Sequence, residues 1–150
     1  MPRPHVTALA ILMLASGAPA AVAADLPLSI AVGDASLKWG ACPAIFPTGC
    51  EIGVLHGDPA KPNADVFLRV RGGQVLPAHT HSSAERMVLV TGRLKVKYRG
   101  AAEAVLTPGM YAFGPAGLPH SATCMSTGPC TLFIAFEGPV DAMAHPGPLD

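Results

Sequence analysis

The sequence lacks net charge, clear helical periodicity and a second long apolar run. Its 150 residues carry ten Lys or Arg against ten Asp or Glu. A chain without excess positive charge has no global electrostatic reason to bind nucleic acid, so we expect no nucleic-acid partner. The weak helical periodicity argues against a helical protein. The one long apolar run lies near the N-terminus, so it is the one place where a membrane segment has to be considered.

That apolar run, residues 6–18, is typical of the middle of a secretory signal peptide. It follows Arg3 and gives way to small residues in "PAAVAAD", in the order that signal peptides show. A membrane anchor is the less favoured alternative, because thirteen residues are too few to cross ~30 Å of hydrocarbon as a helix. We predict a signal peptide over residues 1–24, cleaved after Ala24 or, nearly as well, after Ala23. The mature protein would be periplasmic or secreted, without a stable membrane anchor, and its net charge would be 9 − 10 = −1 after Arg3 is lost.

The cysteine content fits export. All four cysteines (Cys42, Cys50, Cys124 and Cys130) lie beyond the signal peptide, and an even number in an oxidising compartment predicts disulfides. Three pairings are open. The local one, Cys42 with Cys50 and Cys124 with Cys130, demands least from the fold, because the turn-rich "MSTGP" separates the last two. A zinc site built from all four thiolates ranks lower, since the spacings are wider than in common zinc knuckles.

Short strand-like runs dominate the rest of the chain. The 16 Gly and 16 Pro are spread without a repeat, which indicates many turns. Nine runs predict an all-β sandwich or barrel; they are "ASLKW", "EIGVL", "DVFLRVR", "ERMVLV", "RLKVKYR", "AEAVLT", "MYAFG", "HSATC" and "CTLFIAF". We expect a single domain over residues 25–137 and a Pro-rich, mostly irregular tail over residues 138–150.

The stretch "PAHTHSSAERM" brings His79, His81 and Glu85 into close succession. On a strand, alternate side chains share a face, so the two histidines would point the same way with Cα atoms ~6.6 Å apart. Two imidazoles at that spacing can bind one metal ion. Glu85 would lie ~13 Å beyond His81 on a straight strand. It can join the histidines only if the chain turns at residues 82–84, where two serines suit a turn.

Two longer patterns around these residues resemble the two motifs of the cupin superfamily. Residues 73–92, "GQVLPAHTHSSAERMVLVTG", match Gly, five residues, His-x-His, three residues, Glu, six residues, Gly. Residues 109–124, "GMYAFGPAGLPHSATC", match Gly, five residues, Pro-x-Gly, two residues, His, three residues, and then Cys124 where the family has Asn. The second pattern adds His120 to the set. A disulfide between Cys124 and Cys130 would pin the hairpin that carries it.

The resemblance implies a cupin jelly-roll β-barrel in which His79, His81, Glu85 and His120 bind one divalent transition metal. Three imidazoles and a carboxylate suit Fe, Mn, Ni, Cu or Zn, and such a site leaves one or two positions open for water or substrate. The resemblance also implies that a homodimer is the oligomeric state to test. The motif glycines lie where turns need a positive φ.

The function that we favour is a metal-dependent enzyme acting on a small organic molecule. The resemblance implies dioxygenase, isomerase or lyase chemistry, and we lean toward a dioxygenase-like oxidoreductase. The main alternative is a non-catalytic periplasmic module that binds or senses a metal or small ligand. A third reading is a cupin in which the metal only stiffens the barrel. Fold does not decide among them.

An enzyme needs a proton-transfer group beside its metal. The predicted neighbours of the ligands are Tyr111, Arg69 and Cys124, with Tyr98, Arg71 and the distant His56 as further options. The other residues near the motifs are apolar, and a dry barrel of this kind suits a hydrophobic or aromatic substrate or O2. They are Met87, Leu89, Val75, Phe113, Phe133 and Phe136.

Overall fold

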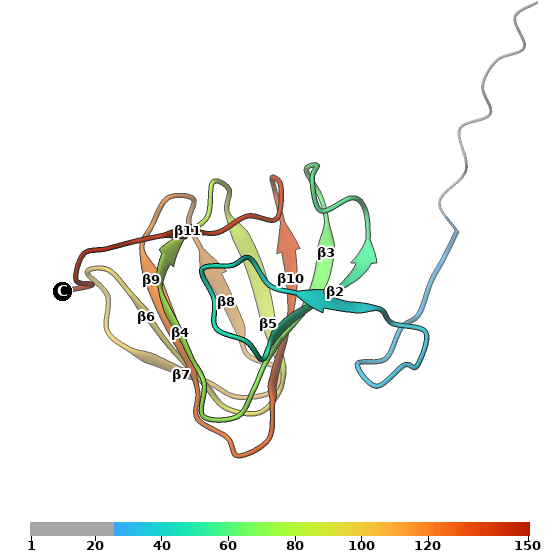
Figure 1. Cartoon of the computed structure of the whole chain (residues 1–150), viewed down its shortest axis with the longest axis horizontal. Coiled ribbons are helices and arrows are strands. Elements are labelled where there is room, and N and C mark those ends of the chain that lie inside the picture. Colours follow the sequence, from blue (N-terminus) through green and yellow to red (C-terminus); the bar gives the residue numbers. More distant parts are fainter. Residues whose placement is uncertain (1–25) are drawn as a thin grey trace, which may run out of the picture.

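The structure, a computed structural model, describes residues 26–150. The signal peptide predicted over residues 1–24 lies outside the described residues. The regular secondary structure of the described part consists of eleven β-strands in two sheets that face each other (Figure 1). Among these residues there is no helix with the length and hydropathy needed to span a membrane.

The larger sheet has six strands in the order β1-β2-β3-β10-β5-β8. Their bounds are Trp39–Ala41 (β1), Cys50–His56 (β2), Asp65–Val70 (β3), Cys130–Phe136 (β10), Glu85–Thr91 (β5) and Tyr111–Gly114 (β8). Each neighbouring pair is antiparallel. Strand β10 lies between β3 and β5 although it is far from both in sequence, which is the long-range pairing of a jelly roll.

The smaller sheet has five strands in the order β11-β4-β9-β6-β7. Their bounds are Met143–Ala144 (β11), Val75–Thr80 (β4), His120–Cys124 (β9), Leu94–Tyr98 (β6) and Ala104–Leu106 (β7). The second cupin-like pattern therefore begins before β8 in one sheet and ends with β9 in the other.

Apolar side chains from both sheets fill the space between them. Leu76 and Val96 of the smaller sheet belong to one buried cluster with Met87, Leu132 and Ile134 of the larger sheet. Full burial of such a side chain contributes roughly 1.5–3 kcal/mol to stability. The predicted all-β barrel is confirmed. Two strands come in addition to the nine expected runs: β4 and the two-residue β11.

A bulge in β4 decides which of its residues face the interior. The register between β4 and β9 shifts between Leu76 and His79, so one extra residue is inserted and the alternation of faces is reset. Leu76 and His79 are therefore both buried although their offset is odd. Pro77 lies within the shift, where a missing N–H is tolerated. Val75, which we expected in the wall of the barrel, is instead 53% exposed.

The four cysteines form the local pairs, Cys42–Cys50 and Cys124–Cys130. The first bond closes the loop before β2, and the second closes the connection between β9 and β10. Cys124 and Cys130 are fully buried. Gly92 packs against the second bond, because a Cβ there would lie 2.8 Å from Cys130 Sγ and its φ is +86°. This pairing leaves no thiolates for the zinc site considered above.

The C-terminal segment crosses the barrel instead of leaving it. Strand β11 pairs with β4, and the Val140 N–H donates to the carbonyl of Pro59 at 2.8 Å. In Figure 1 this red segment runs over the top of the sheets to the marked C-terminus. Residues 138–145 thus pack on the domain that we expected to end at residue 137.

Candidate metal centre

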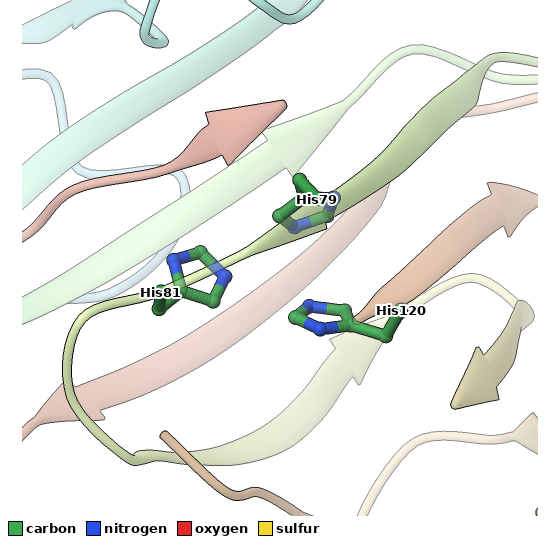
Figure 2. A group of neighbouring side chains, drawn as sticks. All are labelled: His79, His81 and His120. Atoms are coloured by element: carbon green, nitrogen blue, oxygen red, sulfur yellow. The ribbon is translucent and has the colours of Figure 1, made fainter. Parts of the chain in front are cut away.

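Three histidines from neighbouring strands converge inside the barrel (Figure 2). His79 on β4 pairs directly with His120 on β9, and His81 follows the end of β4. The ring centroids of His79 and His120 are 4.2 Å apart, and those of His79 and His81 are 4.9 Å apart. The three potential ligand nitrogens all lie within 4.8 Å of one another. All three side chains are buried.

Each imidazole is held from behind by a backbone carbonyl. The Nδ1–H of His79 donates to Pro77 O at 2.7 Å, and that of His120 donates to Leu118 O at 3.1 Å. The Nδ1–H of His81 donates to Asp141 O, from the C-terminal segment. A donor role for Nδ1 leaves the Nε2 lone pair of the neutral ring available to a metal. The backbone therefore sets both the tautomer and the direction of all three rings.

Glu85 reaches the same point from the opposite sheet. It opens β5 after the turn at residues 82–84, and its Oε1 lies 3.3 Å from His120 Nε2. Its Oε2 lies 3.6 Å from His81 Nε2. Burial raises the pKa of the Glu85 carboxyl to about 8. The predicted turn thus exists, and it brings the carboxyl to the histidines across the barrel rather than along one strand.

Burial also keeps the imidazoles neutral. It lowers the pKa of His79 to about 4, against the opposing effect of the Pro77 carbonyl. It lowers the pKa of His120 to about 3, and the neighbouring His79 adds to this shift. The pKa of His81 is lowered for the same reason. Neutral rings are the form that binds a metal ion.

The fifth polar group at this point is Tyr98, at the end of β6. Its ring centroid lies 4.8 Å from that of His120. A Cβ built on Gly114 would lie 2.7 Å from Glu85 Oε1 and 3.0 Å from the Tyr98 hydroxyl. The absent side chain of Gly114 therefore leaves the space in which these two groups approach each other. Burial, with Glu85 as a second cause, raises the pKa of Tyr98 above its ordinary value.

The cavity around these groups is small and mostly apolar. Its volume is about 50 Å³, whereas ligand pockets usually measure ~300–1,000 Å³. Two aromatic residues belong to its apolar wall. The ring of Phe46 is edge-on to that of His79, with the ring centroids 4.7 Å apart, and the ring centroid of Phe136 is 5.5 Å from that of His81. Among residues 26–150, no lysine or arginine lines this cavity.

The residues present fit a bound divalent metal ion. Three imidazole nitrogens and a carboxylate are donors that suit Fe, Mn, Ni, Cu or Zn. Within the described chain, Glu85 Oε1 and the Tyr98 hydroxyl are buried without a hydrogen-bond partner. An unsatisfied buried polar group costs ~1–3 kcal/mol, and a cation at this point would relieve that cost for Glu85.

The structure corrects the predicted position of Tyr111. It is 57% exposed, and it pairs with Val88 on the outer face of the larger sheet. Cross-strand partners share a face; because Glu85 faces inward, its partner Gly114 does too, and Phe113 then faces outward. Phe113 is accordingly 48% exposed instead of lining the barrel. Of the two tyrosines, Tyr98 is the one that lies beside the ligands.

The other two predicted neighbours of the ligands also lie elsewhere. Arg69 donates to Glu51 at 2.9 Å and stacks over Trp39 at 3.8 Å from the ring centroid, so its charge is engaged on the outer face of β3. Cys124 shares the inward face of β9 with His120, but its sulfur is bonded to Cys130. It acts on the site only by holding the strand.

Sequence reasoning missed three neighbours of the ligands. Phe46 and Asp141 lie in segments that carry no cupin-like pattern, so no signal pointed to them. Gly114 lies inside the second pattern at a position that the pattern leaves open. The signal for Tyr98 was present: residues 93–99 alternate strictly between basic and apolar, which puts Tyr98 on the same face as the buried Leu94.

Similar solved structures share the fold. One is a chain from the crystal structures of the DMSP lyases RdDddP and RnDddQII. It is 22% identical to this chain, with a TM-score of 0.63, and the match covers 73% of this chain and 62% of that chain. DMSP lyase DddQ from Ruegeria pomeroyi DSS-3 is 21% identical, with a TM-score of 0.62 over 75% of this chain and 64% of that chain. This chain thus spans less than two thirds of the length of either lyase chain.

A shorter neighbour is an RmlC-like cupin from Shewanella frigidimarina NCIMB 400. It is 20% identical, with a TM-score of 0.55 over 68% of this chain and 85% of that chain. A comparison with curated proteins gives no match. The model of the ChrR cupin-like domain matches residues 29–141, which include both motifs and all four candidate ligands. The chain therefore belongs to the ChrR cupin-like family, within the cupins whose motifs it carries.

Proposed function

We propose that this protein is an exported, metal-dependent enzyme that acts on a small organic molecule. One divalent transition metal would be held by His79, His81, Glu85 and His120. The observation that carries the proposal is the meeting of three carbonyl-oriented imidazoles and one unpaired carboxylate oxygen in a buried cavity. The geometry does not select among Fe, Mn, Ni, Cu and Zn, because all five accept this donor set.

A bound ion would supply Lewis acidity toward an oxygen donor of the substrate. The chain's own residues do the rest. The carbonyls of Pro77, Leu118 and Asp141 hold the rings in place. Glu85 balances one positive charge in an apolar surrounding. The apolar walls exclude water, which strengthens every electrostatic interaction inside.

Tyr98 favours an enzyme over the alternative, a non-catalytic periplasmic module for a metal or small ligand. A binding protein has no need of a proton-transfer group, whereas an enzyme places one beside the reacting atoms. The Tyr98 hydroxyl is buried, has no hydrogen-bond partner in the described chain and adjoins Glu85. Its raised pKa keeps it protonated, so it would donate a hydrogen bond or a proton to the substrate. Isomerase and lyase reactions that move a proton use such a donor, and lyases occur among the proteins of similar fold.

The test is turnover by metal-loaded protein. Samples loaded separately with each of the five metals are incubated with small phenols, diketones and dicarboxylates, while O2 uptake and products are measured. We expect turnover with at least one metal and a loss of at least tenfold in Tyr98→Phe, with Tyr111→Phe as a matched exposed control. Binding without turnover, unaffected by Tyr98→Phe, would instead support the binding module.

Export is supported by the two disulfides, because such bonds persist in oxidising compartments. The signal peptide over residues 1–24 stays a prediction, and N-terminal sequencing of the mature protein tests it. The homodimer also stays a prediction, which light scattering of the purified protein tests.

A further inference from the structure

A second hollow lies directly outside the metal cavity. It is an open groove of about 530 Å³. Pro43, Ile52 and Val140 line both the cavity and the groove, so these three side chains separate the two spaces. Trp39 and Val54 extend the apolar wall of the groove away from the cavity. The groove is therefore adjacent to the candidate metal centre, on the other side of these three side chains.

The small inner cavity limits what can bind there. At about 50 Å³ it holds an ion and roughly one or two water-sized groups. A ligand with a body of several carbon atoms cannot fit beside the ion. It has to extend past Ile52 and Val140 into the groove, which is about ten times larger. The groove is thus where the body of such a ligand would lie.

The charges at the centre limit the head of the ligand. A divalent ion with ionised Glu85 and three neutral imidazoles carries a net charge of +1. One anionic oxygen donor neutralises it, whereas a second anionic group would be buried without a partner, since no lysine or arginine of residues 26–150 lines the cavity. An unpaired buried charge is strongly unfavourable. Lys38 lines only the outer groove, where it is exposed to water.

We propose that the ligand of this site has one anionic oxygen-donor head and an apolar body, with the head in the cavity and the body in the groove against Trp39, Ile52 and Val54. This inference rests on the proposed metal-dependent function and specifies its substrate class. Simple carboxylates with a straight alkyl chain are the probes that test it.

Trp39 provides the readout, because it lines the groove and is the chain's one tryptophan. Zinc-loaded mature protein is titrated with acetate, butanoate, hexanoate and octanoate, and binding is followed by tryptophan fluorescence and calorimetry. Burial of each additional methylene is expected to tighten binding roughly three- to fourfold until the groove is filled. Hexanedioate, which has the length of hexanoate but a second carboxylate, is expected to bind more weakly and to lose the gain from the outer methylenes, because its far carboxylate would lie against the apolar wall of the groove.

Two valine variants locate the effect. Val54→Asp puts a carboxylate into the groove at a position that is 40% exposed. Val105→Asp is the matched control, since Val105 is 37% exposed and lies on β7 of the other sheet. We expect Val54→Asp to bind acetate and zinc normally but to lose the gain with chain length. The Val105→Asp protein should behave as wild type.

The possible results distinguish a failure of the groove proposal from a failure of the proposed metal-dependent function. If the protein binds zinc in the expected amount but its affinity for carboxylates does not depend on the length of their alkyl chain, the proposed role of the groove is wrong and the metal-dependent function is unaffected. Hexanedioate binding as tightly as hexanoate, or equal behaviour of the two valine variants, would overturn the role of the groove as well. Failure of the protein to bind zinc or any of the other four metals would overturn the metal-dependent function, and the inference with it.

Discussion

The imidazole of His81 donates its Nδ1–H to the backbone carbonyl of Asp141, sixty residues further along the chain. The carboxylate of Asp141 in turn accepts the N–H of Ser82 at 2.9 Å. The two bonds fasten the C-terminal segment to the turn between His81 and Glu85. A segment far from both motifs thereby takes part in orienting one of the four candidate ligands.

The Asp141 carboxylate should therefore affect metal affinity without touching the metal. In Asp141→Ala the acceptor for Ser82 is lost and the carbonyl that holds His81 is free to move, so we expect affinity to fall about ten- to a hundredfold. Asp141→Asn keeps an acceptor oxygen and should stay close to wild type. Competition with a chelator of known affinity measures this. Equal effects of Ala and Asn would show that the carboxylate does not position His81.

Metal binding should release a proton from Glu85 at neutral pH. In the metal-free protein burial raises the pKa of Glu85 to about 8, so this carboxyl is protonated at pH 7 and must ionise to bind. The pKa values of His79 and His120, lowered to about 4 and about 3, mean that these two histidines are already neutral and release no proton. Burial also lowers the pKa of His81. Apparent affinity should then rise about tenfold per pH unit below pH 8 and level off above it. Calorimetry at pH 6.5 in buffers of different ionisation enthalpy should count about one proton per ion, and a count near zero would contradict this assignment.

Glu85→Gln should stabilise the metal-free protein at pH 8. The pKa of the Glu85 carboxyl is about 8 in the folded state, against an ordinary value of 4.5. The unfolded chain therefore ionises first, and this group's contribution to stability falls as pH rises through that window. Glutamine does not ionise. The free energy of unfolding of the variant should therefore exceed that of wild type by roughly 2–4 kcal/mol at pH 8 and differ little from it at pH 4.5.

The matched control for that measurement is Glu103→Gln, because Glu103 is exposed and pairs with Lys95 at the surface. Urea denaturation at both pH values checks the two variants. A Glu85→Gln protein that is less stable than wild type at pH 8 would mean that Glu85 is ionised and satisfied in the metal-free fold.

Gly114→Ala should damage the site from the side opposite the histidines. The new methyl would lie within 3 Å of both Glu85 Oε1 and the Tyr98 hydroxyl, so one of the two has to move. We expect metal affinity to fall on the order of tenfold. Gly128→Ala is the control, since a Cβ there meets no atom within 4 Å. Unchanged affinity in Gly114→Ala would show that Glu85 is not needed at its position in the structure.

The two disulfides should have similar effects on stability and different effects on the site. Serine replacement of either pair is expected to lower the free energy of unfolding by roughly 2–3 kcal/mol, given the short loops that they close. Loss of the Cys42–Cys50 bond also frees the loop in which Phe46 packs against His79. The affinity of this variant for longer carboxylates should therefore differ from that of wild type. Mass mapping that finds Cys124 as a free thiol would contradict the pairing that holds β9.

Much of the barrel and the four candidate ligands could be predicted from the sequence, because local alternation and fixed motif spacing determine them. The alternation of faces in residues 85–89 is one such pattern, because it puts Glu85 on the same side as Met87 and Leu89, and all three are buried. The exposure of Val75 could not be predicted, because the bulge between Leu76 and His79 depends on how β4 pairs with β9. The same limit applies to Tyr111, whose face is set by the pairing of β8 with β5.

The neighbours of the ligands were harder to predict than the ligands themselves. Asp141 acts through its backbone carbonyl, and any residue type has one. Phe46 lies in the loop that the Cys42–Cys50 disulfide closes. Contacts of this kind depend on three-dimensional packing between segments that share no pattern, so a single sequence carries little information about them.

The most direct test is the metal content of the mature protein beside that of His81→Ala, with His56→Ala as a histidine control at the end of β2. After growth with all five candidate metals, elemental analysis should find about one divalent ion per chain in wild type and in His56→Ala. His81→Ala should hold close to none, because it loses one of three imidazoles that meet within 4.8 Å. Equal metal content in wild type and His81→Ala, whether near one or near zero, would contradict the four-ligand centre.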